Sequence, residues 1–567
     1  MLDFHKRENK PTWWRLFDRM GRNDDDLKDD MDCLVGLIRT NKEPYLPTSR
    51  SRNRVYEYKF NPDQPFKGQL NNFYVLGQDN LKAKSFNYLR DEGLIEIQSK
   101  KELPKTISLV PDEFINPSPI PEAVESVINN LLDKGLPDCA ITDFLRRKRP
   151  RITGNLKGKL IDFDLNGHEM IQEILEVTQS LDHSYLCIQG PPGSGKTYTA
   201  KHIIGKLLES GKRVGISSNS HSAIINLMKG VCNYVETHGI DANLIKAGGD
   251  KNDSVFLSSS IKHSSGPRDC YDDVTSPSVC IGGTAWFFCN DLFDSTDNEK
   301  DFIPLDYLFI DEAGQVSLAN LIGMSRACRN IIMMGDQMQL SQPIQGSHPG
   351  NTGQSVLEYL LQDKSTIPSD LGIFLPKTYR MHQNICSVIS DHVYDARLVS
   401  DDSTQKHVIE VSGQLIKQQS GICFIPVDHE GNTQGSEEEA EMITSISEEL
   451  IGSYYWPEKE GLKKRTLEWN DILFVAPYNY QVNLLRKALG KKAKVGSVDL
   501  FQGQEAPVVI ISMCSSDASE SPRGIDFLFS KNRMNVALSR AQALAVVVGS
   551  SKLAKTKVTS LEQMSLV

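Results

Sequence analysis

The sequence predicts an α/β protein with two tandem domains, each built around a parallel sheet, behind a smaller N-terminal region that is first helical and then β-rich. From residue 181 onward, short apolar runs bounded by Gly, Pro, Asp or Asn alternate with stretches of helical spacing. Such runs are typical of strands buried on both faces of a parallel sheet. A polar connector with a proline, residues 362–375, separates them into two sets. The expected strands are Tyr185–Ile188, Val214–Ser217, Tyr307–Asp311, Ile331–Met334, Ile472–Ala476, Val508–Met513 and Ala543–Val548.

Five segments are expected along the chain. The first carries charged residues with aromatic insertions, and the second carries short alternating apolar runs with turns between them. Alternation of this kind favours a small antiparallel barrel or sheet. The segments are an N-terminal helical segment (1–49), a small barrel-like β domain (50–120), a helical stalk (121–165), a first α/β domain (166–370) and a second one (371–567). Within the first α/β domain, the polar stretch 228–278 is expected to be a surface loop or a small insertion.

Composition and charge exclude several classes of protein. Of the 567 residues, 39% are hydrophobic and 24% are charged, which excludes collagen-like, disordered and coiled-coil chains. The net charge of −10 excludes a globally basic nucleic-acid binder but leaves room for a local binding groove. No apolar stretch reaches the length of about 18 residues that a membrane span needs. The N-terminus lacks a secretory signal, so we expect a cytoplasmic protein.

The cysteines point to the same compartment. The chain has 11 of them and no C-x-x-C pair. Reduced structural thiols are therefore expected, as is usual for a cytosolic protein. A zinc site around Cys270, Cys280 and Cys289 is the alternative interpretation.

A phosphate-binding loop is predicted directly after the first expected strand. Its pattern is G-x-x-x-x-G-K-[ST], preceded by an apolar run and followed by an amphipathic helical stretch. Glycines at these positions let backbone N–H groups surround phosphate oxygens, while the lysine reaches the β- and γ-phosphates and the hydroxyl of the last residue holds Mg²⁺. The loop comprises Gly190, Pro191, Pro192, Gly193, Ser194, Gly195, Lys196 and Thr197.

Two adjacent acids end the apolar run 307–311, in the stretch FIDEAGQ. At the end of a parallel strand, Asp311 is expected to hold Mg²⁺ through its water shell, together with Thr197. Glu312 is expected to act as the general base on the attacking water. Two neighbouring carboxylates in an apolar setting are costly unless a cation compensates them, which favours this pairing with the phosphate-binding loop.

Three further residues complete the predicted hydrolytic site. Gln339 follows the expected strand 331–334 in the stretch GDQMQL and is expected to sense the γ-phosphate; an ordinary turn is the alternative. Arg380 and Arg540, both in the second α/β domain, are candidate arginine fingers, with surface or structural arginines as the alternative. Fingers supplied across a cleft make hydrolysis depend on closure of the two domains.

These motifs and their order resemble those of superfamily 1 helicases. The branch is the one that contains the nonsense-mediated-decay RNA helicase, the immunoglobulin-mu-binding helicase and the replication nuclease–helicases. The resemblance implies two RecA-like domains with ATP and Mg²⁺ between them. It covers residues 189–541 through the stretches QGPPGSGKT (189–197), SSNSHSAIINL (217–227), GGTAW (282–286), FIDEAGQ (309–315), GDQMQL (335–340), TYRMH (378–382), APYNYQV (476–482), VDLFQGQE (498–505) and NVALSRA (535–541).

A narrower resemblance extends to bacterial proteins that join a RecB-like nuclease to this type of helicase. It rests on residues 2–20, 342–361 and 429–441. It implies that the chain is a fragment, or a separated reading frame, of the longer arrangement. A RecB-like nuclease domain or chain is then an expected partner, and the motor itself is expected to be monomeric.

The resemblance also implies roles for single residues. Tyr379 stacks on adenine, and Arg380 and Arg540 contact the γ-phosphate together with Gln339. Glu505 approaches the ribose or the metal-side waters. The residues expected to line the path of a nucleic-acid strand are Ser220, His221, Thr284 and Trp286 in the first domain, and Tyr478, Gln481 and Gln502 with Gly503 in the second. For Trp286, packing in the core is the alternative interpretation.

One departure from the family's pattern concerns the base. The usual adenine-reading Gln of L-N-x-x-Q is replaced here by Glu169 in Leu165-Asn166-Gly167-His168-Glu169. Gln172, one helical turn further, is the candidate substitute for this residue.

Three functions are compared. The favoured one is a 5′-to-3′ motor on single-stranded nucleic acid, with DNA preferred over RNA and a place in DNA repair or processing; polarity and preference follow from the resemblance alone. An RNA helicase of the same family is the nearest alternative. The second function is an ATP-dependent clamp that does not unwind, and the two second-domain arginines argue against it. The third is a GTPase, for which no N-K-x-D motif is present.

Overall fold

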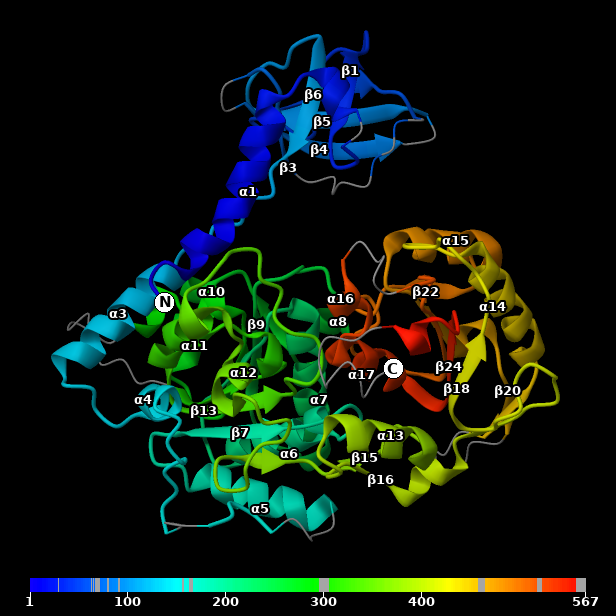
Figure 1. Ribbon diagram of the computed structural model, residues 1–567. Helices are drawn as coiled ribbons and strands as arrows, with labels where there is room; N and C mark the ends of the chain where they lie inside the picture. Colours follow the sequence, from blue (N-terminus) through cyan, green and yellow to red (C-terminus); the bar gives the residue numbers. More distant parts are fainter. Residues whose placement is uncertain are drawn as a thin grey trace. The chain divides into compact units, whose positions relative to one another are not determined.

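The computed structural model forms two compact units, one comprising residues 1–118 with 344–353 and the other residues 119–343 with 354–567. It describes residues 1–28, 30–62, 64, 66, 72–78, 81–89, 92–154, 158–162, 167–294, 305–456, 464–517 and 523–556. Figure 1 shows both units in sequence colours. Each is described by itself below. Among these residues, no helix combines the length and the apolar character needed to cross a bilayer.

The first unit is a closed barrel of six antiparallel strands with an N-terminal helix. The strand order around the barrel is β1-β2-β5-β4-β3-β6, and β6 pairs back with β1. Buried side chains such as Tyr58, Phe73 and Ile97 fill the interior. The elements are α1 (Phe4–Gly21), α2 (Asp24–Leu27), β1 (Leu34–Arg39), β2 (Arg54–Lys59), β3 (Asn72–Val75), β4 (Lys82–Leu89), β5 (Leu94–Ser99), β6 (Thr106–Pro111) and η5 (Gly350–Gly353).

The predicted boundary at residue 49 is wrong, because strand β1 lies inside the segment expected to be helical. The helical pattern ends with α2, and the apolar run Leu34–Arg39 then pairs with β2 on one side and β6 on the other. Without β1 the barrel would expose two unpaired strand edges. The barrel-like expectation therefore holds for a domain that begins about 16 residues earlier than predicted, by the difference between positions 50 and 34.

A loop from far along the chain completes the first unit. The carboxylate of Glu8 on α1 accepts hydrogen bonds from the backbone N–H groups of Gln345 (3.0 Å) and Gly346 (2.9 Å) and from Nε2 of His348 (2.6 Å). The ring of Phe4 stacks on His348 with 4.5 Å between centroids. Although burial opposes it, these donors lower the pKa of Glu8. Two of the three stretches of the narrower resemblance, 2–20 and 342–361, thus meet here.

The second unit contains the two predicted α/β domains. The first is built on an eight-stranded sheet in the order β10-β9-β11-β8-β12-β13-β7-β14, and its neighbouring strands pair in parallel. Its strands are β7 (Tyr185–Gln189), β8 (Val214–Ser217), β9 (Asn243–Ala247), β10 (Lys262–Ser264), β11 (Val279–Gly282), β12 (Leu305–Ile310), β13 (Cys328–Gly335) and β14 (Ile373–Phe374).

The second α/β domain is built on a five-stranded parallel sheet in the order β18-β24-β23-β21-β22. Two smaller sheets flank it. The strands are β15 (Lys377–Thr378), β16 (Val399–Ser400), β17 (Val408–Glu410), β18 (Gly421–Pro426), β19 (Tyr454–Trp456), β20 (Arg465–Thr466), β21 (Ile472–Val475), β22 (Lys494–Gly496), β23 (Ala506–Ser512) and β24 (Ala541–Gly549).

Helices cover these sheets, as Figure 1 shows for α6 and α7 beside the first sheet and α14 and α15 beside the second. They are α3 (Ile120–Asp133), α4 (Ala140–Leu145), α5 (Gly167–Gln179), α6 (Lys196–Glu209), α7 (His221–His238), α8 (Val255–Ser258), α9 (Tyr271–Val274), α10 (Ala285–Phe288), α11 (Leu318–Met324), α12 (Val356–Leu361), α13 (Gln383–Val393), α14 (Glu437–Leu450), α15 (Asn479–Leu489), α16 (Ile525–Leu528) and α17 (Lys531–Leu538). Short 3₁₀ turns are η1 (Pro267–Cys270), η2 (Asp291–Phe293), η3 (Ala313–Gln315), η4 (Ser325–Ala327), η6 (Asp402–Lys406), η7 (Trp469–Asp471) and η9 (Leu553–Lys555).

All seven expected strands are present, each within two or three residues of its expected bounds. The interpretation of residues 228–278 as a surface loop is wrong. Helix α7 continues to His238, and β9 and β10 then extend the first sheet at its edge. The edge strand β10 is short and partly exposed, and β9 begins with a half-buried Asn243, which is why the pattern resembled a loop.

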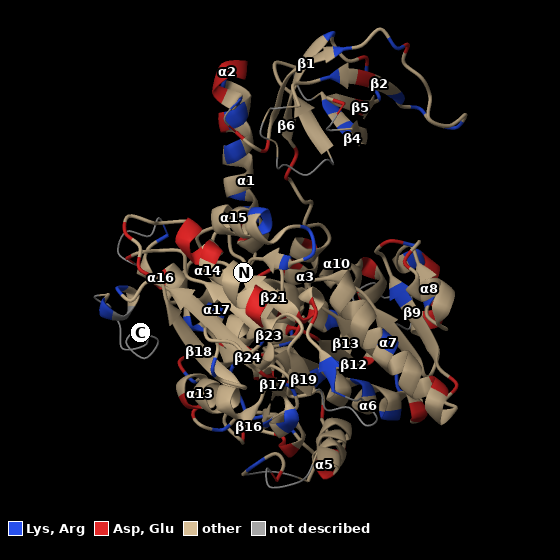
Figure 2. Cartoon of the chain, turned by 90° about the vertical axis from the view of Figure 1, so that its right-hand side faces the viewer, with Lys and Arg blue, Asp and Glu red and all other residues tan. Residues whose placement is uncertain are grey.

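Charge is spread over both units. Figure 2 shows basic and acidic residues interspersed along helices and loops, with an acidic run on α2. The negative net charge therefore does not prevent local basic surfaces.

All 11 cysteines are free thiols, and Cys270, Cys280 and Cys289 are buried.

Candidate active site

The predicted phosphate-binding loop joins β7 to α6 in the first α/β domain. Gly193 (φ 72°) and Gly195 (φ 80°) adopt the left-handed conformation that only glycine tolerates at little cost. This turn delivers Lys196 to the first position of α6 and aims the helix N-terminus at the loop. A helix N-terminus with free backbone N–H groups is suited to bind phosphate.

Two polar groups of the loop lack a counter-ion or partner of their own. The hydroxyl Oγ of Ser194 is buried and has no hydrogen-bond partner among the described residues. The Lys196 ammonium donates to a neutral acceptor, the carbonyl oxygen of Gly190, at 2.6 Å. Thr197 lies exposed in the first turn of the same helix. Phosphate oxygens would satisfy both groups, so the residues present fit a nucleotide triphosphate.

The acidic pair lies at the end of β12, next to β8 and β13 in the sheet. Burial and the neighbouring Glu312 charge raise the pKa of Asp311, and the Lys196 ammonium opposes that rise. Glu312 is held in the left-handed region at φ 52°, which is uncommon for a residue with a side chain. A divalent cation would compensate both carboxylates, as predicted for Asp311 with Thr197.

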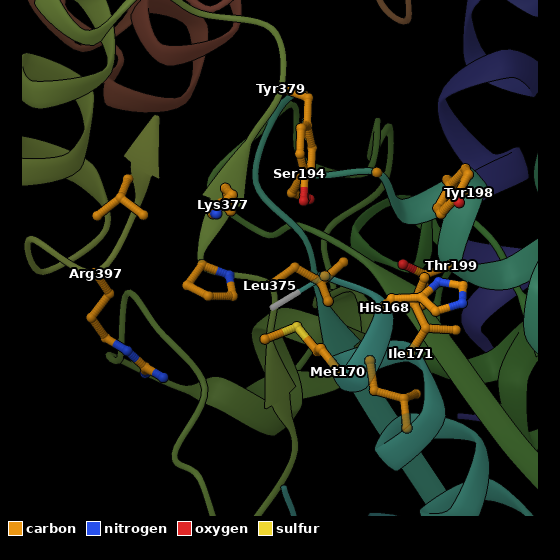
Figure 3. Close-up of a pocket in the computed structure, with 16 residues that line it drawn as sticks. His168, Met170, Ile171, Ser194, Tyr198, Thr199, Leu375, Lys377, Tyr379 and Arg397 are labelled. Atoms are coloured by element: carbon orange, nitrogen blue, oxygen red, sulfur yellow. The ribbon is translucent and has the colours of Figure 1, made fainter. Parts of the chain in front are cut away.

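A cavity of about 740 Å³ opens beside the phosphate-binding loop. Figure 3 shows residues of its wall: Met170 and Ile171 from α5, Ser194 from the loop, and Tyr379 directly after β15. Tyr379 is half-exposed, and its backbone N–H donates to the Gly193 carbonyl at 2.9 Å. Apolar walls and the Tyr379 ring next to a phosphate site suit a flat base, in line with the role that the resemblance implies for Tyr379.

The proposed substitution of Gln172 for the adenine-reading Gln is not supported. Gln172 and Glu169 line a separate cavity of about 480 Å³, together with Tyr234. The Gln172 amide donates to Glu176 Oε1 at 3.1 Å. Residues three apart on α5 share one face, and this face turns to α6 and α7 instead of the base cavity. Leu165 and Asn166 lie outside the described residues.

The two candidate arginine fingers reach the cleft from the second domain. Arg380 Nε donates to Glu505 Oε2 at 2.5 Å, and Arg380 Nη1 donates to the Ser539 carbonyl at 3.2 Å. It also lies against the phosphate-binding loop, because a Cβ on Gly193 would come within 2.5 Å of the Arg380 Cβ. Glu505, expected near the ribose, thus holds Arg380.

Arg540 lies between α17 and β24 with 2% of its surface exposed. Its guanidinium donates to the carbonyl oxygens of Val536 and Gln504 and to Gln339 Oε1, at 3.2, 3.3 and 3.4 Å. Burial, followed by the charge of Arg380, lowers the pKa of Arg540 to about 10. A buried guanidinium that bonds only neutral oxygens is suited to receive an anion.

Gln339 connects the two domains. Its Nε2 donates to Asp336 Oδ2 at 2.9 Å and its Oε1 accepts from Arg540. It therefore lies after the end of β13 and bonds the second domain, and its role as a γ-phosphate sensor stays a prediction.

The first-domain residues predicted to meet a nucleic-acid strand gather at the ends of two adjacent strands, β8 and β11. Ser220 and Thr284 begin helices α7 and α10, and His221 is exposed. Trp286 is 40% exposed, so core packing does not account for it. The buried Lys246 ammonium bonds His221 Nδ1 at 2.9 Å, which fixes the imidazole.

Two second-domain predictions are corrected. Gln481 is fully buried, and its amide bonds the backbone of Ser436 and the hydroxyl of Ser512. Tyr478 is 6% exposed and packs against Phe527 at 5.3 Å between ring centroids. Both therefore support the loop around them and present no free surface to a strand. Gln502 is half-buried.

Sequence reasoning missed several residues of the site. His168, Lys377 and Arg397 line the base cavity, and Tyr394 and Asn535 bond the loop that carries Gln339. Asn535 belonged to a quoted motif, but nothing in the spacing assigned it a contact. The others carry no local pattern, because they converge only in the folded chain.

Comparison with known proteins agrees with this arrangement. Residues 173–344 match one protein family described as AAA domain, and residues 352–552 match a second with the same description. The chain is 28% identical over 423 residues to "DNA polymerase alpha-associated DNA helicase A" of Schizosaccharomyces pombe, covering 65% of this chain and 61% of that protein. It is 26% identical to "DNA replication ATP-dependent helicase/nuclease dna2" of the same organism, covering 77% and 32%. It is 24% identical to "DNA-binding protein SMUBP-2" of Rattus norvegicus, covering 64% and 40%.

The chain thus spans less than two thirds of the length of these relatives. The matched regions nonetheless contain the loop at Gly190, the acidic pair, Gln339 and both cleft arginines, in the predicted order. Two parallel-sheet domains carry them on facing edges. In motif order, in its two parallel-sheet domains and in these relatives, the chain is similar to the superfamily 1 helicases.

Proposed function

We propose that the chain is an ATP-driven motor that hydrolyses ATP between its two α/β domains and moves along single-stranded nucleic acid, with DNA preferred. The observation that carries the proposal is the pair of cleft arginines, Arg380 and Arg540, facing a phosphate-binding loop of the other domain. A binding switch needs no second-domain cation at the γ-phosphate, whereas a motor must link hydrolysis to domain closure.

Each residue of the site has its own proposed role in ATP hydrolysis. Lys196 and the loop N–H groups would hold the β- and γ-phosphates, and Thr197 with Asp311 would hold Mg²⁺, which supplies charge neutralisation when bound. Glu312 takes the proton of the attacking water. Arg540 and Arg380 stabilise the charge that develops on the transferred phosphoryl group. Gln339, which lies between Asp336 and Arg540, points its side chain towards the same group.

We propose that the cavity binds the adenine base without the base-reading Gln that the family's pattern contains. Tyr379 and the apolar wall of the cavity offer stacking to any base, and neither Glu169 nor Gln172 lines that wall. Base selectivity then has to come from the polar groups that do line the cavity, such as His168 and Lys377.

The preference for DNA is supported by the names of the relatives: one is a DNA helicase, one a DNA replication helicase/nuclease and one a DNA-binding protein. A monomeric state, a location in the cytoplasm, 5′-to-3′ movement, a role in DNA repair and a RecB-like nuclease partner are expectations carried by the sequence. The relative named helicase/nuclease supports a nuclease partner in general.

The test is the ATPase rate with matched single-stranded DNA and RNA of several lengths. Stimulation by DNA that grows with length supports the proposal, because a moving motor hydrolyses more ATP per encounter on a longer strand. Stimulation by RNA alone assigns the RNA-helicase alternative. A rate that responds to neither strand contradicts the proposed function.

A further inference from the structure

A closed ring of buried hydrogen bonds connects the γ-phosphate sensor to the second domain. Asp336 Oδ2, at the end of β13, accepts from Gln339 Nε2 at 2.9 Å and from the Tyr394 hydroxyl at 2.6 Å. Asn535 on α17 donates to Tyr394 Oη at 2.8 Å and to the Met338 carbonyl at 2.7 Å. Arg540 follows the same helix and donates to Gln339 Oε1, which closes the ring.

The chemistry of the partners fixes the direction of each bond. A carboxylate only accepts and a guanidinium only donates, so Gln339 must turn its NH₂ to Asp336 and its oxygen to Arg540. Asn535 donates into the Tyr394 oxygen, so the Tyr394 proton goes to Asp336. Burial and the Asp336 charge raise the pKa of Tyr394, which keeps that proton in place.

Tyr394 lies in a turn that contacts both domains. It follows α13, which packs on β18, β24 and α17 of the second domain. The next residues bond the first domain, Asp395 through Thr366 Oγ1 at 2.8 Å and Arg397 through the Ile367 carbonyl at 2.9 Å. Asp395 and Ala396 are both left-handed, at φ 52° and 58°, so the turn is held against its own backbone preference.

We propose that Tyr394 is a positioning residue that couples the γ-phosphate to domain movement. Its hydroxyl holds Asp336, and Asp336 in turn holds the Gln339 side chain in the position that bonds Arg540. Tyr394 does not touch the nucleotide in this account. When Arg540 and Gln339 turn to a γ-phosphate, the ring of bonds must rearrange, and the Tyr394–Asp336 bond transmits that rearrangement to α13 and α17. The inference rests on the proposed function.

The test is Tyr394→Phe, which removes one oxygen and keeps the buried ring. Tyr185→Phe is the matched control, because Tyr185 is also fully buried and its hydroxyl donates to the Lys148 carbonyl at 2.6 Å, outside the ring of bonds described above. We expect Tyr394→Phe to lower the strand-stimulated kcat by about tenfold, with the Kd for a non-hydrolysable ATP analogue within about twofold of wild type. The control is expected to leave both within about twofold.

A second readout does not depend on hydrolysis. Fluorophores at Leu257 (90% exposed, first domain) and Ser445 (exposed on α14, second domain) report the distance between the domains. The analogue is expected to change energy transfer in wild type and in Tyr185→Phe, and to change it less in Tyr394→Phe.

The outcomes separate the two proposals. If wild type lacks strand-stimulated ATPase, the proposed function fails, and the energy-transfer readout alone judges Tyr394. An unchanged kcat in folded Tyr394→Phe, equal losses of kcat and analogue affinity, the same loss in Tyr185→Phe, or an energy-transfer response identical to that of wild type would each overturn the role of Tyr394. So would a wild-type protein in which the analogue produces no change in transfer.

Discussion

Replacing Arg540 by methionine tests whether the buried charge of Arg540 serves catalysis and not stability. Burial and the nearby Arg380 lower the pKa of Arg540 from its ordinary value to about 10. Because a tenfold change in an acid dissociation constant corresponds to about 1.4 kcal/mol, the buried charge disfavours the nucleotide-free fold by ~3 kcal/mol. The sign follows from the direction: below pH 10 the group is charged in both the folded and the unfolded chain, so the whole cost is present at pH 7, and it is relieved only as the pH rises above about 10.

Methionine removes that cost together with three hydrogen bonds. These bonds are long, 3.2 to 3.4 Å, and end on neutral oxygens, so each contributes ~1 kcal/mol or less. The two effects nearly offset, and we expect Arg540→Met to change the free energy of unfolding by ~1 kcal/mol at most. The same substitution should lower kcat by about 10³-fold or more, the scale of a lost arginine finger, with ATP affinity largely kept.

The assay combines chemical denaturation, binding of a fluorescent ATP analogue and steady-state ATPase on one preparation. Arg213→Met is a suitable control, since Arg213 is also buried but pairs with Asp306 at 3.4 Å and should lose stability without a specific loss of kcat. A large loss of stability in Arg540→Met, or equal losses of analogue affinity and kcat/KM, would make Arg540 a structural or ground-state residue and refute the reasoning.

Three further substitutions test other parts of the site. Lys196→Ala should abolish hydrolysis, because it removes the cation that the loop holds on the Gly190 carbonyl; measurable turnover above background would contradict its role. Glu312→Gln should keep ATP binding and lower kcat by roughly 10²-fold or more, as expected for a lost general base, and wild-type turnover would exclude that assignment. Trp286→Ala should weaken binding of a labelled single strand by about 1–3 kcal/mol in fluorescence anisotropy, with the salt dependence nearly unchanged, because stacking displaces no counter-ions. If the folded variant binds as wild type does, Trp286 lies outside the strand path.

The sheets could be predicted from sequence because their strands are buried on both faces. Runs such as Ile331–Met334 and Val508–Met513 are continuously apolar, and that signal needs no tertiary context. The same rule fails where a strand carries polar residues or lacks a clear boundary. Strand β9 contains Asn243 and Lys246, and β1 follows a helix without a Gly or Pro boundary, so neither had the pattern of a central strand.

The places of the proposed phosphate-site residues could be predicted for a different reason. Lys196, Asp311 and Glu312 occupy positions fixed by the loop and by the strand end, so their spacing predicts a role for each. The strand-path residues of the second domain were not fixed in this way. Gln481 belongs to a recognisable stretch, yet its amide is fully used by Ser436 and Ser512, which only the packing of α14 against α15 and β23 reveals.

The contacts between the domains were beyond sequence reasoning altogether. Asp336 and Tyr394 are 58 positions apart, and Asn535 is a further 141 from Tyr394. Each is an ordinary polar residue in its own segment, and the hydrogen bonds exist only because two sheets present their strand ends to the same cleft.

The central claim, that ATP hydrolysis in the cleft drives movement along a strand, is tested most directly by displacement of streptavidin from biotinylated single-stranded DNA. With ATP, the protein is predicted to accelerate release from a 3′-biotin and not from a 5′-biotin, while Glu312→Gln releases neither. Strand-stimulated ATP hydrolysis without faster release from either end would contradict the claim and leave an ATP-dependent clamp. Faster release from the 5′-biotin alone would keep the motor and reverse its direction.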